Sequence, residues 1–496
     1  MARAGLLAVL VLAGCRGTGG TGTPPAPHIL LVSLDGVRAD RTHLGGNPRP
    51  TTPSLDALAA DGLVFDEALS TSNESLYSHA AMLTGRYPGE VGSLDYLSMV
   101  VPPSAWTLAE ALAAAGYDTA AFTSGGHVKA SFGFGQGFGT VTEGQDYGSL
   151  RDSVAPALAW LDARPDRARP TFLFVQGYDC HQPYLHGSVF HHVFAEGDPG
   201  RADTWLARRN FVESIHEGVY YPDYPLAWLN HTVGERILDP SVYRSLPTWA
   251  AQAGPGAGLT LTDAETAHVR AHYDAAVLEA DTYLGLLLDG LDARGRLEDT
   301  LVVITSDHGE DLGTHGAWNH RAGLWESTTR VPLVLAGAIP QALRGTRPNA
   351  VAQSIDLVPT LLAAAGTVAP AGAHGRDLLA LAAGRGAGPE VVYQHGVLGH
   401  LSARTDRWRL TFDAGDLAAS DATKRLVHGP LEAPAWALHD RATDPDERRN
   451  VLDRHPDEAA RLREGMVRWW TALPRGAPAA PPSDADRAML QRNGYW

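Results

Sequence analysis

The chain has 496 residues, of which 44% are hydrophobic and 19% charged, and this composition excludes a disordered or collagenous protein. The length predicts one large core with a smaller one beside it. A formal net charge of -16 argues against a nucleic-acid partner, because such proteins need a basic face to neutralise phosphates.

The first residues, MARAGLLAVLVLAGC, predict a secretory signal peptide over residues 1–15. They contain one basic residue, Arg3, and an apolar run at 6–12 that is too short to span a bilayer. LAGC at 12–15 resembles the lipobox of bacterial lipoproteins, whose cysteine is lipidated after cleavage. The resemblance implies that Cys15 anchors the protein to a membrane of the bacterial cell envelope, facing the periplasm or the surface. An ordinary signal peptide with an incidental cysteine is the alternative.

Residues 16–27, RGTGGTGTPPAP, are predicted to form a flexible linker between this anchor and the folded protein. The only other cysteine is Cys180, so no intramolecular disulfide is expected once Cys15 carries lipid. The fold must therefore be stabilised by packing.

Three apolar segments predict buried parallel strands. They are HILLVSLDGV at residues 28–37, TFLFVQGYDCH at 171–181 and TLVVITSDHGED at 300–311. Each run of apolar residues ends in polar or charged ones. This pattern is typical of a strand that is covered on both faces and has its polar end at the carboxyl edge of the sheet.

Helical patterns lie between these strands. TPSLDALAADG, SAWTLAEALAAAG and AAVLEADTYLGLLLDGLDARG have apolar residues at helical spacing and end in glycine. Strands that alternate with helices predict the α/β class, with a mainly parallel sheet sandwiched by helices. In such a sheet, polar residues at the carboxyl ends of different strands converge on one crevice.

Two regions depart from this pattern. Residues 185–262 combine aromatic residues and histidines with proline and glycine, and we interpret them as an insertion that roofs the crevice; a surface excursion with its own apolar cluster is the alternative. Beyond residue 370, EVVYQHG, DRWRLTF and AWALHD predict short strands and DEAARLREGMVRWWTAL predicts a helix. We therefore expect a large domain over 28–370. Over 371–496 we expect a C-terminal subdomain with a small antiparallel sheet, a helix and a tail.

Acidic and imidazole groups follow two of the predicted strands. Asp35 comes after the first strand, and Asp307 is followed directly by His308. Taken singly, each aspartate is explained by a loop or a helix N-cap. Two carboxylates in one crevice repel each other unless a cation or a raised pKa offsets the repulsion. The pair, at the ends of separate strands, therefore predicts a metal site.

Eight motifs occur in an order that resembles the sulfatase family of the alkaline phosphatase superfamily, from residue 28 to about residue 470. They are SLDGVRAD, TTPSLDALAADGLVF, SLYSHAAMLTGRYP, YDCHQPY, YDAAVLEADTYLG, TSDHGEDLGTHG, RVPLVLAG and ALHDRATDPDERRNV. The resemblance implies an alkaline phosphatase-like fold. It also implies a metal-bound nucleophile that displaces the leaving group from a sulfuryl or phosphoryl centre.

The nucleophile of the family stands first in a C/S-x-P-S-R motif, and the matching position here is Ser75. The resemblance implies that Ser75 attacks the ester and that Ser78 begins the following helix as a cap; a second capping serine is the alternative for Ser75. Tyr77 and His79 replace the proline and arginine that direct conversion of the nucleophile to formylglycine. We therefore expect Ser75 to stay an unmodified serine that is activated by a divalent cation.

The metal ligands implied by the resemblance are Asp35, Ser75, Asp307 and His308. Gly36 stands where the family has a second aspartate, and His308 where many sulfatases have asparagine. One oxygen ligand fewer and one imidazole more shift the preference from calcium towards zinc or manganese. We expect one divalent cation, either calcium or zinc or manganese.

The resemblance also implies residues that handle the substrate. Arg321 matches a family lysine and could bind two anionic oxygens, although it could instead pair with Glu326. His181 matches the histidine near the leaving group and is a candidate general acid. His320 would support the anion clamp or complete a second metal site with Asp179.

Two further positions concern the substrate anion. His79 stands in place of the motif arginine, which favours an anion contact over a structural role at the helix start. Ser124 stands where sulfatases have a lysine, so one positive charge of the usual clamp is missing.

The leading hypothesis is a metal-dependent hydrolase of sulfate esters, or of related phosphate esters, that acts on a small molecule or glycan through Ser75. One alternative is an envelope phosphoryl or phosphoglycerol transferase, in which an alcohol replaces water as the acceptor. Another is a non-catalytic family member that binds a sulfated or phosphorylated glycan.

Overall fold

The computed structural model describes residues 26–92, 100–144, 147–181, 261–413, 419–432 and 435–476, together with 184, 189–190, 193–195 and 483. The expected signal peptide, the anchor at Cys15, most of the linker and most of the 185–262 insertion lie outside the described residues. In the part of the chain that is described, no helix combines the length and apolar character needed to cross a bilayer.

Within the described residues, a seven-stranded sheet in the order β2-β8-β7-β1-β6-β4-β5 forms the large unit. Strand β1 (His28–Leu34) lies between β6 and β7 and pairs parallel with both, while β8 runs antiparallel to its neighbours β7 and β2. The other strands are β2 (Leu63–Val64), β4 (Asp118–Thr123), β5 (Thr140–Glu143), β6 (Thr171–Gly177), β7 (Thr300–Thr305) and β8 (Leu333–Gly337).

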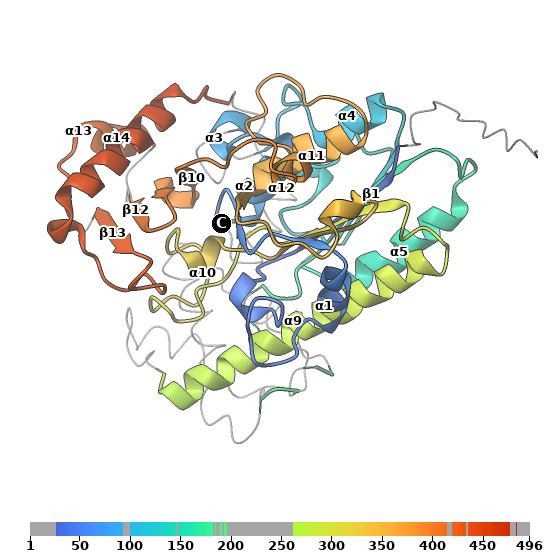
Figure 1. Cartoon of the computed structure of the whole chain (residues 1–496), viewed down its shortest axis with the longest axis horizontal. Coiled ribbons are helices and arrows are strands. Elements are labelled where there is room, and N and C mark those ends of the chain that lie inside the picture. The colour runs from blue at the N-terminus through green and yellow to red at the C-terminus, as the bar shows by residue number, and fades with distance from the viewer. Residues whose placement is uncertain are drawn as a thin grey trace, which may run out of the picture.

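Alternate residues of the central strand point into two separate hydrophobic cores, because side chains alternate across a sheet. Leu30 and Val32 pack in the core that is covered by α1 (Pro53–Ala60), α5 (Leu150–Ala163) and α9 (Asp263–Asp292). Ile29 and Leu31 pack in the core under α2 (Ser75–Thr84), α4 (Leu108–Ala114), α11 (Leu357–Ala364) and α12 (Leu378–Ala382). Figure 1 shows these two groups of helices on opposite sides of β1. A sheet sandwiched by helices was predicted from the sequence, and α1, α4 and the second half of α9 lie in the predicted helical segments.

The C-terminal subdomain contains a four-stranded antiparallel sheet in the order β10-β11-β12-β13. Helix α14 packs on it through a third core that includes Trp436 and Met466, and Figure 1 shows this unit at one end of the molecule. Its elements are β10 (Val392–His395), β11 (Leu401–Arg404), β12 (Trp408–Phe412), β13 (Trp436–Asp440), α13 (Ala419–His428) and α14 (Pro456–Ala472). The expected fold class is confirmed, with a mainly parallel sheet and a small antiparallel sheet plus helix.

Short elements join the two units. Strand β3 (Glu67–Leu69) pairs parallel with β9 (Val351–Gln353) and leads into the segment that precedes α2. Helices α3 (Pro88–Val91) and α10 (Glu326–Thr329) follow α2 and the loop after β7, respectively. Because β1 and β7 are parallel neighbours, their carboxyl ends lie at the same edge of the sheet. The start of α2 lies at this edge too, since Ser75 bonds Asp35.

Candidate active site

Four of the expected site residues meet at the carboxyl edge of the large sheet. Asp35 follows β1, Asp307 and His308 follow β7, and Ser75 is the first residue of α2. The Ser75 Oγ donates a hydrogen bond of 2.9 Å to Asp35 Oδ2 and lies 3.2 Å from His308 Nε2. One ligand atom each of Asp35, Asp307 and His308 lies within 4.8 Å of the others, and all three residues are buried.

Ser75 lies at the N-terminus of α2 because the preceding residue caps the helix. The Glu74 carboxylate accepts a hydrogen bond from the Leu76 backbone N–H at 2.9 Å. The expectation that Ser78 caps this helix is wrong. Ser78 lies one turn inside, where its hydroxyl donates to the Ser72 carbonyl oxygen. The positive end of the helix dipole therefore points at Ser75, which favours negative charge on its oxygen.

The donor set fits a divalent cation. Asp35 Oδ1 and Asp307 Oδ2 are buried carboxylate oxygens that accept no hydrogen bond from any described residue. His308 Nδ1 donates to the Gly309 carbonyl oxygen at 3.0 Å, which leaves the lone pair of Nε2 facing Ser75. Two carboxylates, one imidazole and one hydroxyl suit zinc or manganese and do not exclude calcium.

The two carboxylates have opposite shifts. Burial and the neighbouring negative charges of Asp307 and Glu310 raise the pKa of Asp35 well above its usual value. Burial opposes ionisation of Asp307 as well, but the His308 and His79 rings hold its pKa below the usual range. Without a cation, the pair therefore resists carrying two negative charges at once, and a bound cation would offset the repulsion between two ionised groups.

His79 lies behind the carboxylates, on the side of the core. Its Nδ1 bonds the Ser75 carbonyl oxygen at 2.7 Å, and its Nε2 lies 3.0 Å from the Ser33 hydroxyl. Burial lowers the pKa of the ring. Both ring nitrogens thus contact protein atoms, and the ring stands 3.6 Å from Asp307 Oδ2. This placement differs from the expected anion contact and makes His79 a support for Asp307 and for the first turn of α2.

His320 and His181 extend the site away from Ser75. The His320 ring stacks on His308 with ring centroids 4.0 Å apart, and His181 meets His320 edge-on at 5.2 Å. His320 Nδ1 bonds Glu310 Oε1 at 2.9 Å, and the Tyr184 hydroxyl donates to the other oxygen of Glu310 at 2.6 Å. Burial, His308 and Arg321 lower the pKa of His320, so its ring is neutral.

Arg321 follows His320 on the same loop, and its backbone N–H donates to the Asn319 side chain at 3.1 Å. The expected alternative partner, Glu326, is instead bound by Arg404, Arg409 and Arg441. Ser124, which stands in place of the family lysine, donates its hydroxyl hydrogen to the Gln176 carbonyl oxygen at 2.8 Å. Its hydroxyl is therefore used within the fold.

Asp179 follows β6, and its carboxylate lies against the N-terminus of α5. It accepts hydrogen bonds from the Ser149 hydroxyl at 2.5 Å and the Leu150 backbone N–H at 2.7 Å. Burial raises its pKa to about 7. The alternative in which Asp179 and His320 form a second metal site gains no support, because the metal-binding group found in the described residues is Asp35, Asp307 and His308.

Sequence reasoning missed three groups beside the site: Glu74, His127 and Glu310. His127 lies with Nδ1 3.1 Å from Glu74 Oε1, and both residues are buried. Glu74 directly precedes Ser75 in sequence, which is a signal that could have identified it. His127 follows β4 and could have been identified as a further polar residue after a strand. The only sequence signal for Glu310 is that it lies three residues after Asp307.

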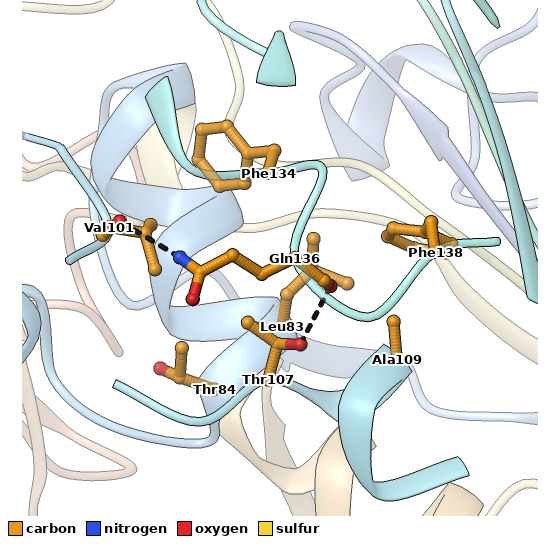
Figure 2. Close-up of a pocket in the computed structure, with 8 residues that line it drawn as sticks. All are labelled: Leu83, Thr84, Val101, Thr107, Ala109, Phe134, Gln136 and Phe138. Carbon is orange, nitrogen blue, oxygen red and sulfur yellow. Dashed lines mark hydrogen bonds between the residues drawn. The ribbon is translucent and has the colours of Figure 1, made fainter. Parts of the chain in front are cut away.

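A small enclosed cavity lies away from these residues. Figure 2 shows it between α2, α4 and the loop after β4, where Gln136 donates to the Val101 carbonyl oxygen and accepts from Thr107 through its own carbonyl. Its volume is about 10 Å³, which is room for about one water molecule. Leu83 lines it and lies eight residues after Ser75, about 12 Å along the helix. The cavity is therefore not a substrate pocket.

The chain is similar to several characterised proteins over most of its length. It is 24% identical to N-acetylglucosamine-6-O-sulfatase of Bacteroides thetaiotaomicron, over 90% of this chain and 86% of that protein. It is 26% identical to the multifunctional alkaline phosphatase superfamily protein PehA of Trinickia caryophylli, over 71% of this chain and 76% of PehA. Among solved structures, BT4656 in complex with its substrate D-glucosamine-2-N,6-O-disulfate has a TM-score of 0.67 and 22% identity, and the match covers 90% of this chain and 98% of that one.

The family comparison covers both units. The model described as N-sulphoglucosamine sulphohydrolase, C-terminal, matches residues 313–468, which include the C-terminal sheet and most of α14. The model described as Sulfatase matches residues 27–367, more than half of the chain, and includes every residue of the four-residue cluster around Ser75. The chain therefore belongs to the sulfatase family of the alkaline phosphatase superfamily.

Proposed function

We propose that this protein hydrolyses sulfate esters with Ser75 as the nucleophile and one divalent cation held by Asp35, Asp307, His308 and Ser75. The observation that carries the proposal is the position of the Ser75 oxygen, 2.9 Å from Asp35 Oδ2 and 3.2 Å from His308 Nε2. A free serine is a weak nucleophile, and a bound divalent cation would supply the Lewis acidity that lowers the pKa of its hydroxyl.

The protein groups have distinct tasks in this scheme. Asp35 accepts the hydroxyl hydrogen bond and orients the Ser75 oxygen for attack on sulfur. The Ser75 hydroxyl proton passes to Asp35 as the bond from Ser75 Oγ to sulfur forms and the bond from sulfur to the leaving oxygen breaks. Arg321 binds the non-bridging oxygens. His181 donates a proton to the leaving alcohol, with His320 packed between it and the metal ligands. His181 then takes a proton from the water that attacks sulfur, Ser75 regains its proton from Asp35, and sulfate is released.

We also propose that Ser75 acts without conversion to formylglycine. Tyr77, at the position of the motif proline, is buried and packs on His395 with ring centroids 5.5 Å apart. His79, at the position of the motif arginine, is held by Ser33 and the Ser75 carbonyl. Both side chains are thus used in packing or hydrogen bonding within the fold. Neither supplies the proline or the arginine of the modification signal. A peptide with formylglycine would be about 2 Da lighter than the serine peptide, which mass spectrometry resolves.

For the substrate we propose a sulfated sugar. The support is the similarity to proteins whose names or titles specify a 6-O-sulfatase of N-acetylglucosamine and a bound glucosamine disulfate. The similarity to PehA, which is described as multifunctional, makes phosphate esters the comparison that any assay should include.

The test compares Ser75→Ala with Ser78→Ala, since both remove a buried hydroxyl from the same helix. We expect Ser75→Ala to lower kcat for sulfated glucosamine about a thousandfold or more, because the attacking atom is lost. Ser78→Ala loses hydrogen bonds to Ser70 and Ser72 and should cost about 1 kcal/mol of stability with activity retained. Full turnover by Ser75→Ala would reject the nucleophile, and turnover of phosphate esters alone would reject the substrate class.

A further inference from the structure

Asn73 joins the nucleophile segment to the loop that carries His320 and Arg321. It is fully buried two residues before Ser75. Its side-chain Nδ2 donates hydrogen bonds to the His320 carbonyl oxygen at 2.9 Å and to the Gly323 carbonyl oxygen at 3.1 Å. The two bonds hold both ends of a four-residue turn. They therefore fix the orientation of the turn as well as its distance from α2.

The C-terminal subdomain holds Asn73 from the other side. The Val397 backbone N–H donates to Asn73 Oδ1 at 3.3 Å, which also fixes which side-chain atom is the oxygen. A Cβ atom on Gly396 would lie 2.6 Å from Asn73 Oδ1 and 3.2 Å from the Leu324 side chain. The turn after β10 therefore approaches Asn73 so closely that position 396 has no room for a side chain.

A second contact holds the same loop one residue further along. The Arg409 guanidinium donates to the Leu324 carbonyl oxygen at 3.1 Å and to Gln394 Oε1 at 2.7 Å. Gln394 in turn donates to the Ser70 carbonyl oxygen at 2.7 Å. Residues 320–324, which we call the clamp loop, are thus bonded to the segment before Ser75 and to the C-terminal sheet at once.

We propose that Asn73 is a positioning residue that sets the clamp loop, and with it Arg321, against the Ser75 oxygen. This inference rests on the proposed function, in which Arg321 binds the anion that Ser75 attacks. Through Val397 and Gly396 the C-terminal subdomain then acts on the placement of the clamp loop. A misplacement of about 1 Å between reacting groups can cost about a hundredfold in rate. Loss of the Asn73 amide can therefore lower the rate by displacing the clamp loop.

A role in the fold alone would be served by hydrogen bonds within one unit. The partners of Asn73 instead come from two segments that lie far from it and from each other in sequence, at 320–323 and 397. Ser354 provides the comparison, since its hydroxyl bonds the Thr71 hydroxyl at 2.6 Å in the same buried segment without touching the clamp loop. Asn73→Ala and Ser354→Ala therefore both remove buried hydrogen bonds of the segment that precedes Ser75. Only Asn73→Ala removes bonds to the loop that carries Arg321.

The test is a double-mutant cycle in the metal-loaded full chain. We expect Asn73→Ala to lower kcat/KM for sulfated glucosamine about 10- to 100-fold and to weaken inhibition by inorganic sulfate, with bound metal unchanged. Adding Asn73→Ala to Arg321→Ala should change little further, because both act through the same contact. Ser354→Ala should stay within about twofold of the wild type. Gly396→Ala, which pushes on Asn73 from the subdomain, should repeat the pattern and serves if Asn73→Ala does not fold.

Hydrogen exchange of the clamp loop supplies a readout that needs no turnover. We expect faster exchange over 320–324 in Asn73→Ala and not in Ser354→Ala. Multiplicative losses from Asn73→Ala and Arg321→Ala, or unchanged exchange in the clamp loop, would overturn the inference. Failure of the proposed function has a different signature, in which Ser75→Ala is as active as the wild type.

Discussion

At the scale of single residues, the site depends on two carboxylates that share one buried space. Asp35 and Asp307 each have a carboxylate oxygen with no hydrogen bond from the described residues. Burial and the negative charge of Asp307 raise the pKa of Asp35, so the metal-free protein stores repulsion that a cation relieves. This arrangement stabilises the loaded protein and weakens the empty one.

We predict that Asp35→Asn stabilises the metal-free protein and destabilises the metal-loaded protein relative to the wild type. The asparagine oxygen can still accept the Ser75 hydrogen bond, and its amide can donate to the Asp307 oxygen that now lacks a partner. In metal-free protein we expect the variant to be more stable than the wild type by about 1–3 kcal/mol in urea unfolding, because an amide replaces a carboxyl group whose ionisation is opposed by burial and by the Asp307 charge. With saturating zinc or manganese, the wild type should be the more stable protein, because the variant binds the cation more weakly.

The control is Asp40→Asn, which removes an aspartate whose side chain is 50% exposed and pairs with Arg38 outside the cluster. Its effect should not depend on metal. If chelation changed the stability of wild type and Asp35→Asn equally, the cation would not be held by Asp35.

Part of the site was predictable at this scale, and the reason is local. Asp35, Asp307 and His308 follow apolar strands, and Ser75 follows from the family motif. The contacts of His79 were not predictable, because an imidazole at a helix start can face either the ligand or the core. Glu310 and Tyr184 were missed because the bond between them joins segments 126 residues apart.

At the scale of elements, a buried ion network attaches the C-terminal sheet to the loop after β7. Glu326, the first residue of α10, is bound by Arg404 of β11 and Arg409 of β12. Burial opposes the charge of Glu326, but these arginines hold its pKa well below the usual value. Arg409 also bonds Glu447 at 2.7 Å. The network therefore fixes where the clamp loop ends.

Arg409→Met should destabilise the protein by about 3–5 kcal/mol, because it removes a fully buried guanidinium that pairs with the buried Glu447 and with Glu326. Arg409→Lys should not restore stability, since an ammonium group cannot donate in the planar fork that reaches both carboxylates. Arg407→Ala is the matched control: that side chain is 56% exposed and pairs with Asp440, so its loss should change stability little. Urea unfolding measures all three, and a small loss for Arg409→Met would show that the network is dispensable.

Elements with a clear period were predicted, and those that depend on tertiary contacts were not. The strand at 28–37 appears as β1, and the helix predicted over 275–295 is the second half of α9, which begins at Asp263. The first half, DAETAHVRAHYD, has few apolar residues at helical spacing. Strand β11, with the sequence LSAR, was missed because its buried Ser402 and Arg404 are polar, and ion pairs stabilise the arginine there.

At the scale of the whole molecule, acid stability depends on histidines that are neutral inside the fold. His395 is 2% exposed at the junction of the two units, between Tyr77 and Trp470. Burial, together with the charges of Arg475 and His400, lowers its pKa to about 3. An unfolded histidine takes up its proton near about pH 6.5. Its contribution to stability is therefore present above that pH and is lost as the pH falls towards 3.

Other groups act in both directions. Burial lowers the pKa of His28 and His439 to about 4, so these two add to the loss on acidification. Burial raises the pKa of Asp179 to about 7 and that of Asp281 to about 6. Stability from these carboxyl groups is fully present below their unfolded pKa and is lost as the pH rises through 6 and 7. The total pH profile is thus a poor probe of any one group.

The difference between wild type and His395→Phe isolates one histidine, because all other groups are common to both proteins. Phenylalanine can pack between the same two rings and takes up no proton. Between about pH 6.5 and pH 5, we expect the metal-free wild type to lose about 2 kcal/mol more than the variant, at about 1.4 kcal/mol per pH unit for one proton. Metal-free protein is used so that acid does not release a cation from the proposed site during the titration. Urea unfolding at both pH values gives the two losses. Equal losses would mean that His395 is protonated in the folded protein, and hence that the junction between the two units is open to water.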